Sequence, residues 1–189
     1  MKSLKIIFTL ALINLACITS MQAQPQGTSE LSLGYGSNSI YKIYKFYDVS
    51  ISTALSSISY SEIESSGVAV LSYKYAVNNR FMLGGSLSYE NLKINKLEYS
   101  GFLDFQQTSG QNYSNFSIAI EADYRYISNP KFQMYSGLGI AYFTSEAFES
   151  NTSYQLTGLG FRVGKKVAAF AELGFGYKGS FVLGASWQF

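Results

Sequence analysis

The residues that most often carry chemistry are scarce in this sequence of 189 residues. Histidine is absent, and Cys17 is the single cysteine. Histidine is the usual general base for a serine nucleophile or a water, and zinc sites are built mainly from histidine and cysteine. A Ser–Lys or carboxylate mechanism needs neither, but no spacing in the chain supports one. We therefore expect no enzymatic activity, no metal site and no cofactor.

Charged side chains are the remaining candidates, and they occur within segments of alternating polarity. Six of them are candidates for one network: Lys74, Glu121, Asp123, Arg125, Arg162 and Glu172. Glu30 and Glu90 occupy similar positions. Such a set could form an ion path or binding site, or a packed interior of ion pairs. We favour the packed interior, because an unpaired buried charge is costly.

The alternation that places these charges has a period of two residues. It is clearest from Phe116 to Tyr126, where even positions are apolar or aromatic and odd positions are small or charged. In a β-strand, these positions point to opposite faces. Similar segments lie near 30–36, 69–75, 81–90, 138–142, 159–163, 167–177 and 181–189. The sequence thus predicts eight strands of about ten residues, long enough to cross a bilayer when tilted.

The links between these strands differ in length. Short links occur at 76–79, 128–131 and 164–166, long links occur at 37–66, 91–115 and 144–153, and only the last link, 178–179, breaks the alternation. Outer-membrane barrels have short periplasmic turns and longer external loops. Aromatic residues also gather near both strand ends, with Tyr177 at the outer rim, as at membrane interfaces. Both features favour a membrane barrel over a soluble one.

The N-terminal residues indicate a secretory signal peptide. A basic start precedes a short apolar run, Ile6 to Ala16, and Met21-Gln22-Ala23 is a small-residue cleavage context. We expect residues 1–23 to be removed by cleavage after Ala23, and residues 24–189 to form the barrel. Acylation at Cys17 is the less favoured alternative, since Asn14 stands where an aliphatic residue is usual.

The expected mature chain carries no excess of either charge. Removal of Lys2 and Lys5 lowers the basic count from 14 to 12, which equals the 12 acidic residues. No basic patch or stripe stands out, so nucleic acid is not an expected partner.

The C-terminal strand carries a separate signal. Apolar residues alternate up to a final aromatic residue: Phe181, Leu183, Ala185, Trp187 and Phe189. This segment resembles the terminal strand by which the outer-membrane assembly machinery recognises its substrates.

Further phrases extend this resemblance to the whole mature chain. These phrases are Asp123-Tyr124-Arg125-Tyr126 and the segment from Glu172 to Tyr177. On their basis, the mature chain resembles the small OmpA/OmpX-like barrels common in Bacteroidota. The resemblance implies an all-β, eight-stranded, antiparallel up-and-down transmembrane barrel in the bacterial outer membrane. It also implies a monomer whose partners are outer-membrane lipids and, during biogenesis, the assembly machinery.

Two long predicted loops, residues 38–64 and 92–114, are the candidates for binding an extracellular partner. Residues 39–57 predict an amphipathic helix or a hairpin, and residues 101–105 place apolar groups in the second loop. These loops either bind a partner or pack on each other over the barrel mouth. We predict a structural or surface-interaction role in adhesion or envelope integrity. A narrow porin-like channel for ions or small solutes is the alternative, and a soluble secreted ligand-binding barrel is the third.

Overall fold

The computed structural model describes residues 26–55, 59–99, 105–145 and 151–189. Its elements are β1 (Ser29–Ser37), α2 (Ile40–Leu55), β2 (Ser59–Ala76), β3 (Phe81–Tyr99), β4 (Phe105–Ser128), β5 (Phe132–Ser145), β6 (Thr152–Gly164), β7 (Val167–Gly176) and β8 (Phe181–Gln188). The predicted signal peptide, residues 1–23, and its cleavage site at Ala23 lie outside the described residues.

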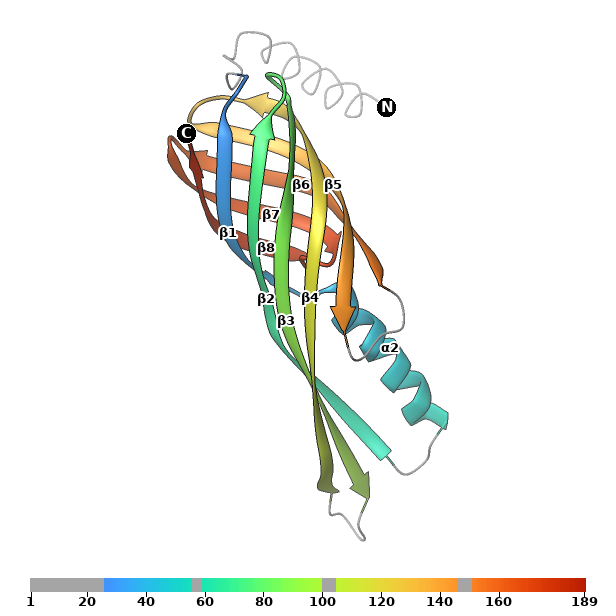
Figure 1. Cartoon of the computed structure of the whole chain (residues 1–189). Coiled ribbons are helices and arrows are strands. Elements are labelled where there is room, and N and C mark those ends of the chain that lie inside the picture. Colours follow the sequence, from blue (N-terminus) through green and yellow to red (C-terminus); the bar gives the residue numbers. More distant parts are fainter. Residues whose placement is uncertain (1–25, 56–58, 100–104, 146–150) are drawn as a thin grey trace, which may run out of the picture.

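The eight strands form a closed antiparallel barrel, in which each strand pairs with the next and β8 pairs with β1 (Figure 1). Leu33 of β1 lies opposite Leu71 of β2 on one side and Ala185 of β8 on the other. Closure leaves no unpaired edge within the barrel wall. The predicted eight-stranded, antiparallel up-and-down barrel is confirmed.

The two ends of the barrel carry different connections. Tight turns at residues 77–80, 129–131 and 165–166 join strands at one end, where the C-terminus also lies (Figure 1). The opposite end carries α2, the long β3–β4 hairpin and the short β7–β8 turn. We call these the turn end and the helix end.

Five strands exceed the predicted ten or so residues, and three of them do so by a wide margin. β2, β3 and β4 have 18, 19 and 24 residues, and their outer parts continue beyond the barrel (Figure 1). Residues 92–114, predicted as a loop, are therefore mostly strand, and β3 pairs with β4 out to Tyr99 and Phe105. The prediction was wrong because it relied on apolar alternation. Backbone pairing continues past the wall, and there Leu92 of β3 packs into a buried cluster with Ile40 and Tyr41 of α2.

The other predicted loop, residues 38–64, contains α2 and the start of β2. The helical alternative for residues 39–57 is confirmed. Asn38 has a φ of 55°, a left-handed conformation that asparagine tolerates, and it turns the chain out of β1. Ser39 then caps the helix, because its Oγ accepts a hydrogen bond from the Lys42 N–H at 3.2 Å. Within the described ranges, no helix is long and apolar enough to span a membrane.

Tyr177 departs from the predicted pattern. It was expected on the outer aromatic rim, but its side chain is fully buried inside the barrel, with 0% exposure. Gly176 has a φ of 146° and ends β7, so strict alternation stops one residue before Tyr177. A backbone that only glycine adopts readily therefore turns this side chain inward.

Candidate functional site

The outward-facing side chains form an apolar belt around the barrel. Exposure reaches 77% at Ile120 and 70% at Ile140. Exposed aromatic residues flank the belt at the turn end (Tyr73, Tyr75, Tyr124, Trp187, Phe189) and at the helix end (Tyr35, Tyr89, Phe116, Tyr142, Tyr154). A soluble ligand-binding barrel would bury such residues and expose its charges. The reversed polarity and the two aromatic girdles define a transmembrane wall.

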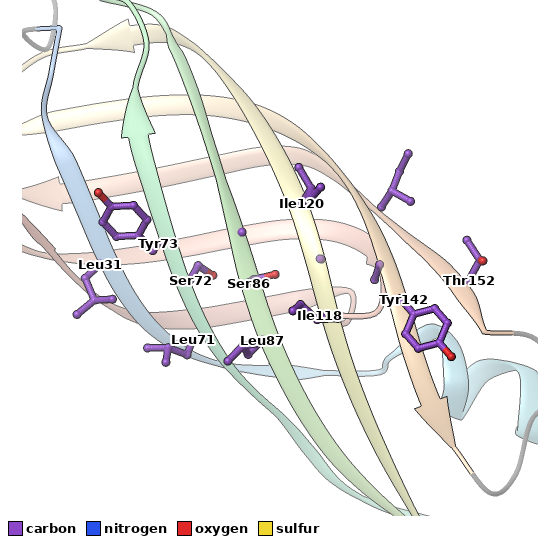
Figure 2. Close-up of a pocket in the computed structure, with 14 residues that line it drawn as sticks. Leu31, Leu71, Ser72, Tyr73, Ser86, Leu87, Ile118, Ile120, Tyr142 and Thr152 are labelled. Carbon is purple, nitrogen blue, oxygen red and sulfur yellow. The ribbon is translucent and has the colours of Figure 1, made fainter.

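One part of this wall is hollowed. A cavity of about 710 Å³ lies over Gly85, whose pairing partners on the neighbouring strands are Tyr73 and Ile120. Figure 2 shows several of the lining side chains, including Leu31, Leu71, Leu87 and Ile118. No charged residue lines the cavity. It therefore suits lipid chains and lacks the converging polar groups of a catalytic pocket.

Inside the barrel, five charged side chains form a first cluster: Lys74, Glu121, Asp123, Glu172 and Lys178. Lys74 Nζ lies 2.7 Å from Asp123 Oδ2 and 2.9 Å from Glu121 Oε2. Lys178 Nζ lies 3.1 Å from Glu121 Oε2 and 3.0 Å from Glu172 Oε2. None of the five side chains is more than 6% exposed. The two ammonium groups thus link three carboxylates across the lumen.

Hydroxyl groups complete the coordination of these carboxylates. The Tyr177 hydroxyl donates to Glu121 Oε1 at 2.5 Å, and Ser86 Oγ donates to the same oxygen at 2.6 Å. The Tyr135 hydroxyl donates to Glu172 Oε1 at 2.9 Å. Buried charges are tolerated when they are both paired and hydrogen-bonded. The cluster has the form of a structural network.

A second cluster lies nearer the turn end and centres on Glu30. Arg125 Nη2 donates to both carboxylate oxygens of Glu30 at 3.1 Å, and Arg162 Nε lies 3.2 Å from Oε2. Gln188 donates to Glu30, and Gln133 accepts from Arg125. Both arginine side chains are 1% exposed. One carboxylate is therefore shared by two buried guanidinium groups.

The first turn of α2 closes the lumen at the helix end. Ser39 Oγ donates to Glu90 Oε2 at 2.5 Å, and Ser65 Oγ donates to Glu90 Oε1 at 2.6 Å. The Tyr41 ring packs 4.7 Å from that of Phe143, and its hydroxyl lies 3.0 Å from Ser117 Oγ. Burial raises the pKa of Tyr41 above its usual value. The helix start is thus part of the barrel core, and it acts as a plug.

The six predicted network charges divide between the two clusters. Lys74, Glu121, Asp123 and Glu172 belong to the first, and Arg125 and Arg162 belong to the second with Glu30. Lys178 was missed, because it stands in the shortest link and outside any alternating segment. The glycines on either side, Gly176 and Gly179, were the available signal, since both have positive φ values of 146° and 102°.

Four of the predicted C-terminal signal residues lie on the outer face of β8, and the fifth, Phe189, directly follows the strand. Phe181, Leu183, Ala185, Trp187 and Phe189 are exposed, and the rings of Trp187 and Phe189 lie 4.5 Å apart. Their recognition by assembly machinery stays a prediction. In the part of the chain that the structure describes, no group of three or more acidic, histidine or cysteine residues could hold a metal ion.

The fold and its reversed polarity define a class: a small eight-stranded transmembrane β-barrel with a filled, charged lumen. No family model and no curated protein matches the sequence. Among solved structures, the chain is similar to the crystal structure of Ail, the attachment invasion locus protein of Yersinia pestis. The two share 18% sequence identity over 87% of this chain and 99% of that chain, with a TM-score of 0.42.

Proposed function

We propose that this chain is a non-catalytic outer-membrane barrel that presents α2 and the outer β2–β4 sheet as a surface for binding other molecules. The orientation is supported by the segregation of the links. Short turns in outer-membrane barrels face the periplasm, and long connections face outward. The helix end, with α2 and the long hairpin, then lies outside the cell.

The observation that carries the binding role is the apolar stripe of α2. Ile40, Tyr44, Tyr47 and Ile51 follow the spacing of one helix face. Ile40 is buried in the barrel mouth at 3% exposure, whereas Tyr44, Tyr47 and Ile51 are 57%, 62% and 60% exposed. The plug therefore continues, beyond the membrane, into an apolar face that the described residues leave exposed. Exposed apolar patches of this kind mark interaction sites.

The edges of the outer sheet add to this surface. β1 pairs with β2 only as far as Val68, and β5 pairs with β4 only from Asn115. Beyond these points, the outer edges of β2 and β4 have no strand partner among the described residues. Such edges offer backbone donors and acceptors to another chain.

A narrow channel is the alternative function. The two ion-pair clusters and the Tyr41 plug argue against it, because an eight-stranded barrel has room for little beyond its own side chains. Single-channel recording in a planar bilayer decides between the two functions. We expect no steady conductance, and large, lasting openings would favour the channel.

Topology and binding can be tested in cells that express single-cysteine variants. Ser50→Cys lies on α2, and Asn78→Cys lies in a tight turn. A membrane-impermeant maleimide added to intact cells should label the first variant alone. Labelling of Asn78→Cys alone would invert the orientation and remove the basis of the proposal.

The stripe itself is tested by cell adhesion. The triple variant Tyr44→Ser/Tyr47→Ser/Ile51→Ser should reduce adhesion of expressing cells to abiotic and host surfaces. Phe46→Ser is the control for loss of an exposed aromatic ring, since Phe46 is 61% exposed and lies outside the stripe, about 100° around the helix from Tyr47, whose ring it meets edge-on at 6.2 Å. Equal adhesion of the triple variant and wild type would refute a binding role for the stripe.

A further inference from the structure

The turn end of the barrel holds a hollow lined by lysines. Its volume is about 310 Å³, and Lys131, Lys165 and Lys166 line it together with Gln133 and Gln188. All three lysines are exposed. In the described part of the chain, none of them forms an ion pair with a carboxylate. Phe189 also lines the hollow. The hollow therefore gathers three ammonium groups that form no ion pair with a described side-chain carboxylate.

The backbone of the two lysine turns is fixed from within the barrel. Arg162 Nη2 donates to the Lys165 carbonyl at 2.9 Å and to the Lys166 carbonyl at 3.2 Å. The Gly164 N–H donates to the Lys131 carbonyl at 2.9 Å, which ties one turn to the other. The carbonyl groups are thus engaged by the barrel, and the three ammonium groups remain available at the rim. The backbone of the site is therefore preorganised for a ligand.

A second, apolar hollow lies on the outer face of the wall, across the rim of the barrel from the first hollow, which the lumen-facing Gln133 and Gln188 help to line. Its volume is also about 310 Å³, and Val167, Ala185 and Trp187 line it with Leu31, Leu33 and Leu71. Neighbouring residues alternate between the two hollows. Lys166 and Gln188 line the charged one, whereas Val167 and Trp187 line the apolar one. Because neighbouring residues of a strand point to opposite faces, the rim of the wall separates the two hollows. A phospholipid whose headgroup turns over this rim would place its phosphate in the charged hollow and an acyl chain in the apolar one.

We propose that the two hollows form a binding site for an anionic phospholipid of the leaflet at the turn end. Its phosphate lies among Lys131, Lys165 and Lys166, and one acyl chain lies in the groove beside Trp187. This inference rests on the proposed function, which places the turn end at the periplasmic face. The charge distribution favours an anion there, since the three tight turns at that end carry Arg80 and these lysines but no acidic residue.

The single tryptophan of the chain, Trp187, lines the groove and is the natural probe. The folded full chain in mixed micelles is titrated with phosphatidylglycerol or phosphatidylcholine, each brominated on its acyl chains. A lysine near an anionic surface contributes about fivefold to binding, or about 1 kcal/mol. Phosphatidylglycerol should therefore quench Trp187 at lower mole fractions than phosphatidylcholine, with a preference of roughly 100-fold at low salt.

Three variants make this test specific. Lys131→Gln/Lys165→Gln/Lys166→Gln should abolish the preference for phosphatidylglycerol. The same three positions changed to arginine should retain it. The matched control, Lys42→Gln/Lys45→Gln/Lys93→Gln, removes three positive charges near the helix end and should leave the preference unchanged. An unheated gel that shows the compact band verifies that each variant has folded.

The possible failures can be told apart. Equal quenching by both lipids in a folded barrel would overturn the inference alone. If glycerol 3-phosphate displaces phosphatidylglycerol at comparable concentration, the hollow is a soluble-anion site and the phospholipid assignment is wrong. A chain that never inserts into micelles or vesicles would overturn the proposed function, and this inference with it.

Discussion

Replacement of Glu30 by glutamine removes the carboxylate that Arg125 and Arg162 share. Arg125 lies 3.1 Å from both oxygens of Glu30, and Arg162 lies 3.2 Å from one of them. Both arginine side chains are 1% exposed, so water cannot replace the lost charge. Loss of one partner from a buried ion pair costs about 3–5 kcal/mol. We expect Glu30→Gln to lower the free energy of unfolding by about this amount.

An exposed ion pair in the same molecule provides the control. Glu64 Oε2 lies 4.0 Å from Lys93 Nζ, and the two side chains are 58% and 46% exposed. Surface pairs contribute about 0–1 kcal/mol, so Glu64→Gln should lower stability by less than about 1 kcal/mol. The two variants remove the same charge, and the expected difference arises from the burial of Glu30 and from its two close guanidinium partners.

Urea titration of the barrel refolded in lipid vesicles measures both changes. Fluorescence of Trp187 reports unfolding, because this tryptophan is exposed on the outer wall and leaves the bilayer when the barrel unfolds. The double variant Glu30→Gln/Arg162→Gln should lose less stability than the sum of its single variants. If Glu30→Gln loses no more stability than Glu64→Gln, the interpretation of the lumen as a structural ion-pair network is wrong.

Three other predictions concern the wall, the plug and the β7–β8 turn. In the same urea assay, Ile120→Lys should lower the free energy of unfolding by about 2–4 kcal/mol, because residue 120 lies within the membrane belt. Val167→Lys should lower it by about 0–1 kcal/mol, because residue 167 lies at the rim of the belt. Equal losses would contradict the placement of the belt. Ser39→Ala removes a helix cap and a donor to Glu90, so amide hydrogen exchange in the first turn of α2 should quicken by about tenfold, equivalent to about 1–2 kcal/mol. Unchanged exchange would mean that the plug is held by packing alone. Gly176→Ala should lower the refolded yield, since position 176 has a φ of 146°; a normal yield would show that this backbone conformation is not required.

Much of the barrel could be predicted from the sequence because the wall separates two environments. Apolar residues such as Ile118 and Ile120 face lipid, and the polar residues between them face the lumen, so alternation alone specifies strand and side. The same logic placed Glu121 and Asp123 inside. Alternation alone did not predict the strands beyond the wall, where the separation between lipid and lumen ends. Residues 106–112 of β4 are polar or glycine and follow no alternating pattern, yet their backbone remains paired with that of β3. In β3, Leu92 and Ile94 continue the alternation, and this signal was missed.

The contacts that complete the lumen network could not be predicted from sequence patterns. Lys178 enters the lumen because glycines on either side allow an unusual backbone, and no periodicity marks it. The plug depends on Tyr41 meeting Phe143, residues far apart in the chain. The partition of charges into two clusters similarly depends on which strands become neighbours when β8 closes on β1.

The central claim is that the apolar wall faces the lipid of an outer membrane. Cell fractionation on a density gradient, followed by gels of heated and unheated samples, tests it most directly. We expect the protein to sediment with the outer membrane and to be extracted only by detergent. Its electrophoretic mobility should change on heating, as the closed barrel unfolds. Recovery of the protein in the soluble periplasmic fraction, with the same mobility before and after heating, would contradict it.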